Sequence, residues 1–308
     1  MLHSKKATPI TVILLFLLAI YCYNLAPLVL SWGPGTNYRN VSVRTTVNVT
    51  ETYPEILNVS CNSGQNISLN AGTTKDINCL VVIRDYNGGN TINTTNSTFY
   101  YYLNASSDPN DNNTHYTNSS CAENSTNGYY TNWTCGFTLL YYANNGTWRA
   151  NATVKDNYNF TANNSKNATI SSLFALNVTT PIDFGNMAVG DTSTSSVPAN
   201  ITNFGNVNIN VSVYGFGAES ETLYPGYAMI CDQRNITVSN ERYDLASGTL
   251  YDAMSVLTSA PANIAGLRVY QQTDDTAQSV NSTYWRLHVN ITNNPFGICN
   301  GTVVFAAQ

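Results

Sequence analysis

The chain has 308 residues, a net charge of −5 and only 10% charged residues, against a usual ~25%. Nucleic-acid binding needs clustered Lys and Arg, so this composition excludes nucleic acid as a partner. The apolar content of 43%, with many Val, Ile and Tyr residues, is enough to build a core and favours folded domains over a disordered polar chain.

The first thirty-two residues differ from the rest of the chain. Lys5 and Lys6 precede a mostly apolar run that extends from Pro9 to Trp32, which is long enough to cross a bilayer as a helix. Residues 1–32 are therefore predicted to form either an uncleaved transmembrane anchor or a cleaved secretory signal. The run exceeds a typical signal core and no A-x-A site follows it, which favours the anchor. Positive flanking residues keep the N-terminus in the cytoplasm, so residues 33–308 are expected outside a single-pass membrane anchor, or secreted.

Residues 33–172 read as a first β domain. Apolar residues alternate with polar ones, as in half-buried strands, in "NVSVRTTVNV" (40–49) and "EILNVSCN" (55–62). Further strands are predicted in "DINCLVVIRDYNGG" (76–89) and "STFYYYLN" (97–104). Residues 105–131 are predicted to form a polar loop, and residues 133–159 a hairpin that turns at Asn144–Gly146.

Residues 173–308 read as a second β domain. In "NITNFGNVNINVSVYG" (200–215) the side chains alternate between two faces on either side of a Gly turn. The predicted inward residues are Ile201, Val207, Ile209, Val211 and Val213, and the predicted outward residues are Asn200, Thr202, Asn208, Asn210 and Ser212. Residues 241–258 allow one short helical turn, and three strands near 263–273, 282–292 and 299–308 complete the domain.

Six cysteines follow the apolar segment: Cys61, Cys79, Cys121, Cys135, Cys231 and Cys299. An even number of cysteines in an exported chain predicts disulfides. One scheme pairs Cys61–Cys79, Cys121–Cys135 and Cys231–Cys299, so that every bond stays within one domain. A rival scheme joins Cys79 to Cys135, at a separation that suits a bond between two sheets. No C-x-x-C occurs and the three His residues are scattered, so no metal site is predicted.

Asparagine is the other recurrent feature. The chain contains about two dozen N-x-S/T sequons, more than twice the number that residue frequencies predict. The predicted glycosylation sites are Asn112, Asn118, Asn124, Asn145, Asn163, Asn200, Asn235 and Asn281. Attached glycans would hydrate a surface that has few charges.

Two stretches resemble immunoglobulin-like modules of archaeal and bacterial surface proteins. "IDFGNMAVGDTS", followed by "NITNFGNVNINVSVYG", resembles one such repeat, and residues 75–159, with "RDYNG" and "GTWRANATVKDNYN", resemble another. With the lysine-flanked N-terminal helix and the dense sequons, the whole is similar to archaeal membrane-anchored or secreted surface proteins. The resemblance implies an all-β fold of two tandem immunoglobulin-like β-sandwich domains after the N-terminal helix, with a structural role and no common catalytic residues.

"KKATPITVILLFLLAI" also resembles the leader of archaeal type IV pilin-like proteins, which implies cleavage after Ala7 and a helix packed in a filament core. Thr8-Pro9 and Pro27 depart from that pattern.

Chemistry-bearing motifs are weak. No G-x-S-x-G, H-E-x-x-H or P-loop occurs. Asp108, Asn110 and Asn112 resemble the start of a calcium loop that lacks its later ligands. "FYYYL" (99–103) reads as core packing or as a carbohydrate platform. We therefore predict a protein without catalytic, metal or cofactor residues: a membrane-anchored surface glycoprotein with a structural or adhesive role and with surface proteins or glycans as partners. A pilin-like filament subunit and a secreted glycan-acting enzyme are the alternatives.

Overall fold

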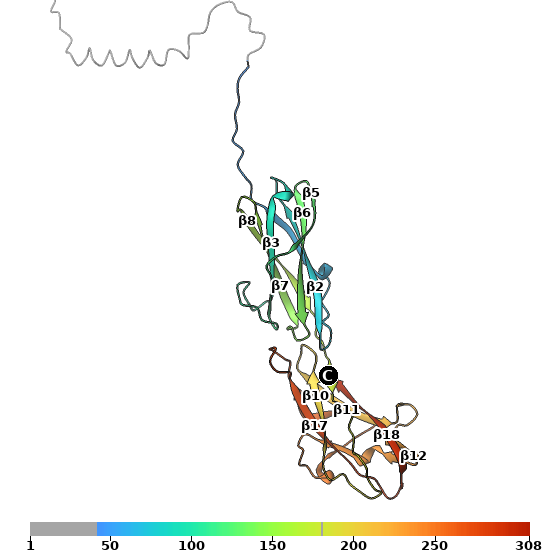
Figure 1. The fold of residues 1–308 in the computed structure, drawn as a ribbon. Helices are drawn as coiled ribbons and strands as arrows, with labels where there is room; N and C mark the ends of the chain where they lie inside the picture. Colours follow the sequence, from blue (N-terminus) through green and yellow to red (C-terminus); the bar gives the residue numbers. More distant parts are fainter. Residues whose placement is uncertain (1–41, 180) are drawn as a thin grey trace, which may run out of the picture. The chain divides into compact units, whose positions relative to one another are not determined.

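The computed structural model describes residues 42–179 and 181–308. These residues are all-β, with four sheets in which neighbouring strands pair antiparallel (Figure 1). Helical structure in the described ranges is limited to 3₁₀ turns at η2 (Asn62–Gly64), η3 (Gly89–Thr91), η4 (Val238–Asn240) and η5 (Tyr251–Ala253). None of the helical elements in these two ranges has the length and apolarity needed to span a bilayer. The predicted anchor or signal, residues 1–32, lies outside the described residues.

The first half of the fold contains two four-stranded sheets. One has the order β1-β2-β6-β5 and the other the order β4-β3-β7-β8. The strands of the first sheet are β1 (Glu55–Cys61), β2 (Thr74–Arg84), β6 (Tyr130–Leu140) and β5 (Ala122–Asn127). Those of the second are β4 (His115–Asn118), β3 (Ile92–Tyr101), β7 (Gly146–Asp156) and β8 (Thr161–Ile170).

Alternation along the strands builds the core between these two sheets. Every second residue of β6 from Thr131 to Leu139 is buried, as expected for strands with one face on a core. Trp148 of β7 is fully buried and stacks on Phe99 of β3, with ring centroids 4.9 Å apart. Phe99 also contacts Phe137 of the opposite sheet, so aromatic rings join the two layers.

The second half contains two five-stranded sheets, in the orders β15-β14-β17-β10-β9 and β13-β12-β18-β11-β16. The first consists of β15 (Ser255–Val256), β14 (Glu241–Asp244), β17 (Val280–Leu287), β10 (Val197–Asn203) and β9 (Leu176–Val178). The second consists of β13 (Asn235–Thr237), β12 (Tyr227–Gln233), β18 (Phe296–Ala307), β11 (Ile209–Gly217) and β16 (Ala262–Val269). The fully buried Trp285 contacts Phe305 across the space between these sheets.

The two halves have separate cores. One hydrophobic cluster draws its buried residues from 56–170, and the others draw theirs from 199–289. Backbone contacts group both halves into one compact unit, Glu51–Gln308. Within it the buried Asn206 side chain accepts a hydrogen bond from the Leu173 N–H and donates to the Ala143 and Ser171 carbonyls. The proposed domain boundary at residues 172/173 and the ranges 33–172 and 173–308 stay predictions.

The alternation predicted for residues 200–215 holds on its apolar side. Ile201, Ile209, Val211 and Val213 are buried and Val207 is half-buried. It fails at two polar positions, because Thr202 and Ser212 are also buried. Ser212 retains a hydroxyl partner, since the Gln308 side-chain amide donates to it at 2.9 Å. A small polar residue can therefore occupy a buried position when the chain end satisfies it.

Three local predictions were wrong. Residues 42–50 do not form a half-buried strand, and Val43, Val47 and Val49 are exposed. Residues 105–131 are not only a loop, because β4 and β5 lie within them. Residues 133–159 do not form a hairpin, because β6 and β7 belong to different sheets. The short helical turn predicted within 241–258 is present as the 3₁₀ turn η5 between β14 and β15.

Candidate functional site

A cleft opens between the two sheets of the second half. On one side lie residues from the end of β9 and the segment after it, and on the other lies the middle of β18. Its volume is about 400 Å³, and its lining residues are Val178, Thr179, Pro181, Ile182, Met229, Glu241, Gly301, Thr302, Val303 and Phe305. These residues are mostly apolar and Glu241 is the only ionisable one among them, which is a usual composition of a small-molecule or peptide binding site.

Glu241 is the first residue of β14 and is 2% exposed. Its position follows from pairing, because it lies opposite Leu287 of the central strand β17, and its backbone carbonyl accepts from the Leu257 N–H at 2.9 Å. Burial raises the pKa of its carboxyl group to about 8. At neutral pH this group is therefore largely protonated and can donate a hydrogen bond into the cleft.

The charged neighbours of Glu241 are engaged elsewhere. Arg242 donates to the Tyr251 carbonyl and Arg286 donates to the Ser193 carbonyl. The His288 ring makes its hydrogen bond with Thr192. A single acid in an apolar cleft can orient one polar group of a bound molecule, whereas most glycoside hydrolases use a pair of carboxyl groups.

A second cavity, of about 640 Å³, adjoins the cleft and shares Ile182 and Met229 with it. It lies between residues 182–189 and 295–299. Phe296 and Ile298 are 70% and 72% exposed at this cavity. The second half therefore exposes apolar surface at these two adjoining cavities.

The structure joins three cysteine pairs: Cys61–Cys79, Cys121–Cys135 and Cys231–Cys299. In the first half three cysteines form a row across a single sheet, because Cys79 lies opposite both Cys61 on β1 and Cys135 on β6. The rival bond between Cys79 and Cys135 would not join two sheets, since both residues are on neighbouring strands of the same sheet. Cys61–Cys79 and Cys231–Cys299 instead connect neighbouring strands, and Cys121–Cys135 connects β6 to the residue that precedes β5.

The predicted glycosylation sites are all accessible. Asn124, Asn163 and Asn281 are exposed, and Asn112, Asn118, Asn145, Asn200 and Asn235 are half-buried. The same holds for every other sequon asparagine in the described ranges. None of the four buried asparagines there, Asn113, Asn203, Asn206 and Asn240, is the acceptor residue of a sequon. In the described residues the acceptor asparagines of sequons and the buried asparagines are therefore separate sets.

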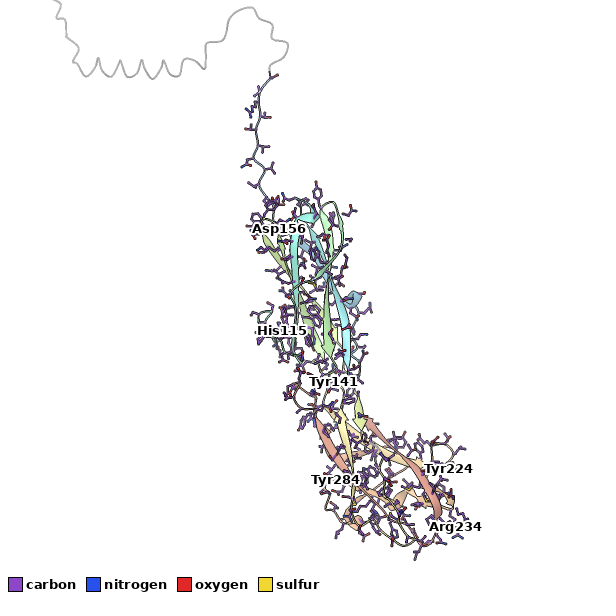
Figure 2. All side chains as sticks on the ribbon, in the orientation of Figure 1. His115, Tyr141, Asp156, Tyr224, Arg234 and Tyr284 are labelled. Atoms are coloured by element: carbon purple, nitrogen blue, oxygen red, sulfur yellow. A yellow bond between two sulfur atoms is a disulfide. The ribbon has the colours of Figure 1, made fainter. Side chains whose placement is uncertain are left out.

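Asp156, labelled at the top of Figure 2, and Asp85 lie near Glu51 at one end of the first half. The Asp85 carboxylate accepts from the Asn87 N–H, and that of Asp156 accepts from the Tyr158 and Phe160 N–H groups, so both carboxylates stabilise turns. Burial, and then the charges of Asp85 and Asp156, raise the pKa of Glu51. No group of acidic, His or Cys side chains with metal-binding geometry occurs among the described residues.

The other two motifs are used for local structure. Asp108 accepts from the Ala105 N–H, and the Asn112 amide donates to Asp275 at 2.6 Å, so the calcium-loop pattern is not assembled. In the aromatic run Phe99 and Tyr100 are buried, and only Tyr102 exposes much of its ring. Phe99 and the half-buried Tyr101 therefore pack in the core of the first half, whereas Tyr102 and Leu103 are exposed.

No family model and no curated protein matches the chain. The crystal structure of dimeric latent PorU from Porphyromonas gingivalis is similar with 12% identity and a TM-score of 0.27, over 83% of this chain and 20% of that chain. A structure of carbohydrate-binding modules from the β-sandwich superfamily is similar with 9% identity and a TM-score of 0.25, over 84% of this chain and 99% of that chain. A DUF4466 family protein from Parabacteroides merdae has 12% identity and a TM-score of 0.22, over 78% of this chain and all of that chain. At TM-scores this low, these likenesses carry no functional argument.

Sequence reasoning missed the cleft. Glu241 lies in a segment in which apolar and polar residues do not alternate regularly. Its neighbour Arg242 is also charged, so the sequence does not indicate which of the two side chains is buried. The incomplete cover over β18 arises from the absence of strand structure in residues 181–196 apart from one bridge at Thr192.

Proposed function

We propose that this chain is a non-enzymatic cell-surface glycoprotein with a structural or adhesive role. Two tandem immunoglobulin-like β-sandwich domains would be held outside the membrane by the helix predicted in residues 1–32. The organisation is that of archaeal surface proteins with such modules, and other surface proteins or glycans would be the partners.

The segregation of sequons carries this proposal. A glycosylated fold must keep every modified asparagine at the surface, and buried asparagines must be unmodified. In support, every sequon asparagine of the described residues is exposed or half-buried, and no buried asparagine there is a sequon acceptor. The three disulfides add support, because such bonds persist in oxidising compartments outside the cytosol.

Glycan mapping and N-terminal sequencing of native material test the proposal. We expect glycans on several of the eight predicted sites and an intact Lys5-Lys6 pair. An unmodified mass, or free thiols at the six exported cysteines, would contradict a surface glycoprotein. A mature chain that starts at Thr8 would instead favour the pilin-like alternative.

A further inference from the structure

Residues 42–50 have the pattern of a strand but no strand partner. Val43, Thr45, Val47 and Val49 occupy one face of the extended sequence and polar residues occupy the other. The three valines are 78%, 84% and 80% exposed. No residue of this segment pairs with a strand within the described ranges. A strand that is added along an apolar cleft needs an apolar face of this kind.

β18 has an edge at which backbone N–H and C=O groups have no strand partner in the described chain. Gln308 and Asn210 exchange both backbone hydrogen bonds, so the bonds between β18 and β11 fall at alternate residues from 308 backwards. The N–H and C=O groups of Val303, Phe305 and Ala307 must then point away from β11. On that side the next strand, β12, pairs only with the 296–300 part of β18. Residues 303–307 are thus a free sheet edge within the described chain.

The free edge borders the cleft that contains Glu241. Val303 and Phe305 line this cleft and are only half-buried, although both pack on the core. β9, across the cleft, pairs with β10 alone. A strand placed beside residues 303–307 would hydrogen-bond to the edge and cover the half-buried side chains with its own alternate residues.

We propose that residues 42–50 of one copy of this chain bind as an added strand along residues 303–307 of β18 in a second copy. The apolar faces match, since Val43, Val47 and Val49 would enter a cleft lined mainly by apolar residues. Thr45 is the only polar side chain on that face, and Glu241 is the only ionisable residue of the lining. A hydrogen bond between the Thr45 hydroxyl group and the Glu241 carboxyl group would therefore fix the register of the added strand against β18.

The reach of the chain requires a second copy. The Thr52 N–H donates to Asn87 at 2.9 Å, which holds the start of the fold at the Arg84 end of β2. The eleven residues of β2 span about 35 Å, and the second half begins beyond the other end, where the Gly72 N–H donates to the Phe204 carbonyl. Nine extended residues span at most about 30 Å. The segment cannot reach the cleft of its own chain.

Donor and acceptor are different surfaces, so the contact is heterologous. Every copy that donates its segment keeps a free cleft, and the assembly grows head to tail as an open chain. The inference goes beyond the proposed function and does not depend on glycosylation or on the membrane helix.

The test compares two aspartate substitutions in the full-length chain, purified in mild detergent. Val47→Asp places a charge on the apolar face, and Thr46→Asp places the same charge one residue away on the polar face, outside any sequon. Mass photometry and negative-stain microscopy measure the multimers. We expect wild type and T46D to form chains of increasing length with concentration, and V47D to reduce the multimer fraction at least tenfold. Association through residues 9–32 would be equal in all three proteins.

Ala307→Pro tests the acceptor edge, because its N–H points away from β11 and proline is tolerated at such an edge. V47D retains the cleft and A307P retains the donor segment, so their mixture should give dimers that do not extend. Equal assembly of V47D and wild type would overturn the proposal, and so would equal loss in T46D and V47D. A monomeric wild type, including one that binds its own segment, would also overturn it. Should A307P fail to fold, the V47D and T46D pair still decides.

Discussion

At the scale of single residues, Glu241 makes stability depend on pH. Burial raises its pKa to about 8. In the unfolded chain a glutamate has a pKa of about 4.3. The folded state therefore holds a proton that the unfolded state releases. This contribution to stability is fully present below about pH 4.3 and is lost as the pH rises towards 8, at up to about 1.4 kcal/mol per pH unit.

Glu241→Gln removes this titration and keeps the shape of the side chain. We expect the free energy of unfolding of wild type to fall relative to E241Q between pH 5 and pH 8, as measured by thermal or denaturant unfolding at several pH values. Glu219→Gln, at an exposed glutamate, is the matched control and should follow wild type. Parallel curves for wild type and E241Q would show that the carboxyl group is solvated.

Single residues also show where the sequence suffices. Trp148 and Trp285 are buried as their places in alternating strands predict. Ser212 and Glu241 are buried against their polarity, the first because the chain end supplies a partner and the second because β14 pairs beside β17. Both depend on residues far along the chain, which no local pattern contains.

At the scale of elements, the disulfides differ in the loops that they close. Cys231–Cys299 closes a loop of 68 residues and Cys121–Cys135 one of 14. In the chain-entropy model the two bonds are worth about 4.4 and about 3 kcal/mol. We expect the double variant C231A/C299A to lose more stability than C121A/C135A, by about 1.4 kcal/mol in denaturant unfolding.

Both cysteines of a bridge must be replaced together. Cys79 and Cys135 are opposite each other in the sheet, so a single replacement would leave a thiol close to a neighbouring bridge and permit exchange. Equal losses in the two double variants would mean that residual structure in the unfolded chain, rather than loop length, sets the effect.

Elements also show the limit of pattern. The period of two in β6 and β7 matches their buried residues, because each has a core on one side and solvent on the other. Residues 42–50 have the same period but no neighbouring strand in the described chain. Alternation in the sequence shows that a segment has an apolar face. Whether the same chain provides an apolar surface on which that face can pack depends on the rest of the fold.

At the scale of the whole molecule, solubility depends on groups other than side-chain charge. A net charge of −5 and 10% charged residues give weak repulsion between copies, while free sheet edges and exposed apolar residues favour association. Glycans on the accessible sequons would supply the missing hydration. The proposed glycans and the free edges would therefore act in opposite directions on the association of copies.

Removal of the glycans from native, folded protein should increase association. We expect light scattering to rise and the soluble concentration to fall after treatment with a glycosidase matched to the mapped sugars, with heat-inactivated enzyme as the control. The V47D variant separates two causes, because it lacks an intact donor segment. If deglycosylated V47D stays dispersed while wild type associates, the glycans limit strand donation. If both associate equally, they shield the remaining low-charge surface, and an unchanged solubility in both would contradict a solubilising role for the glycans.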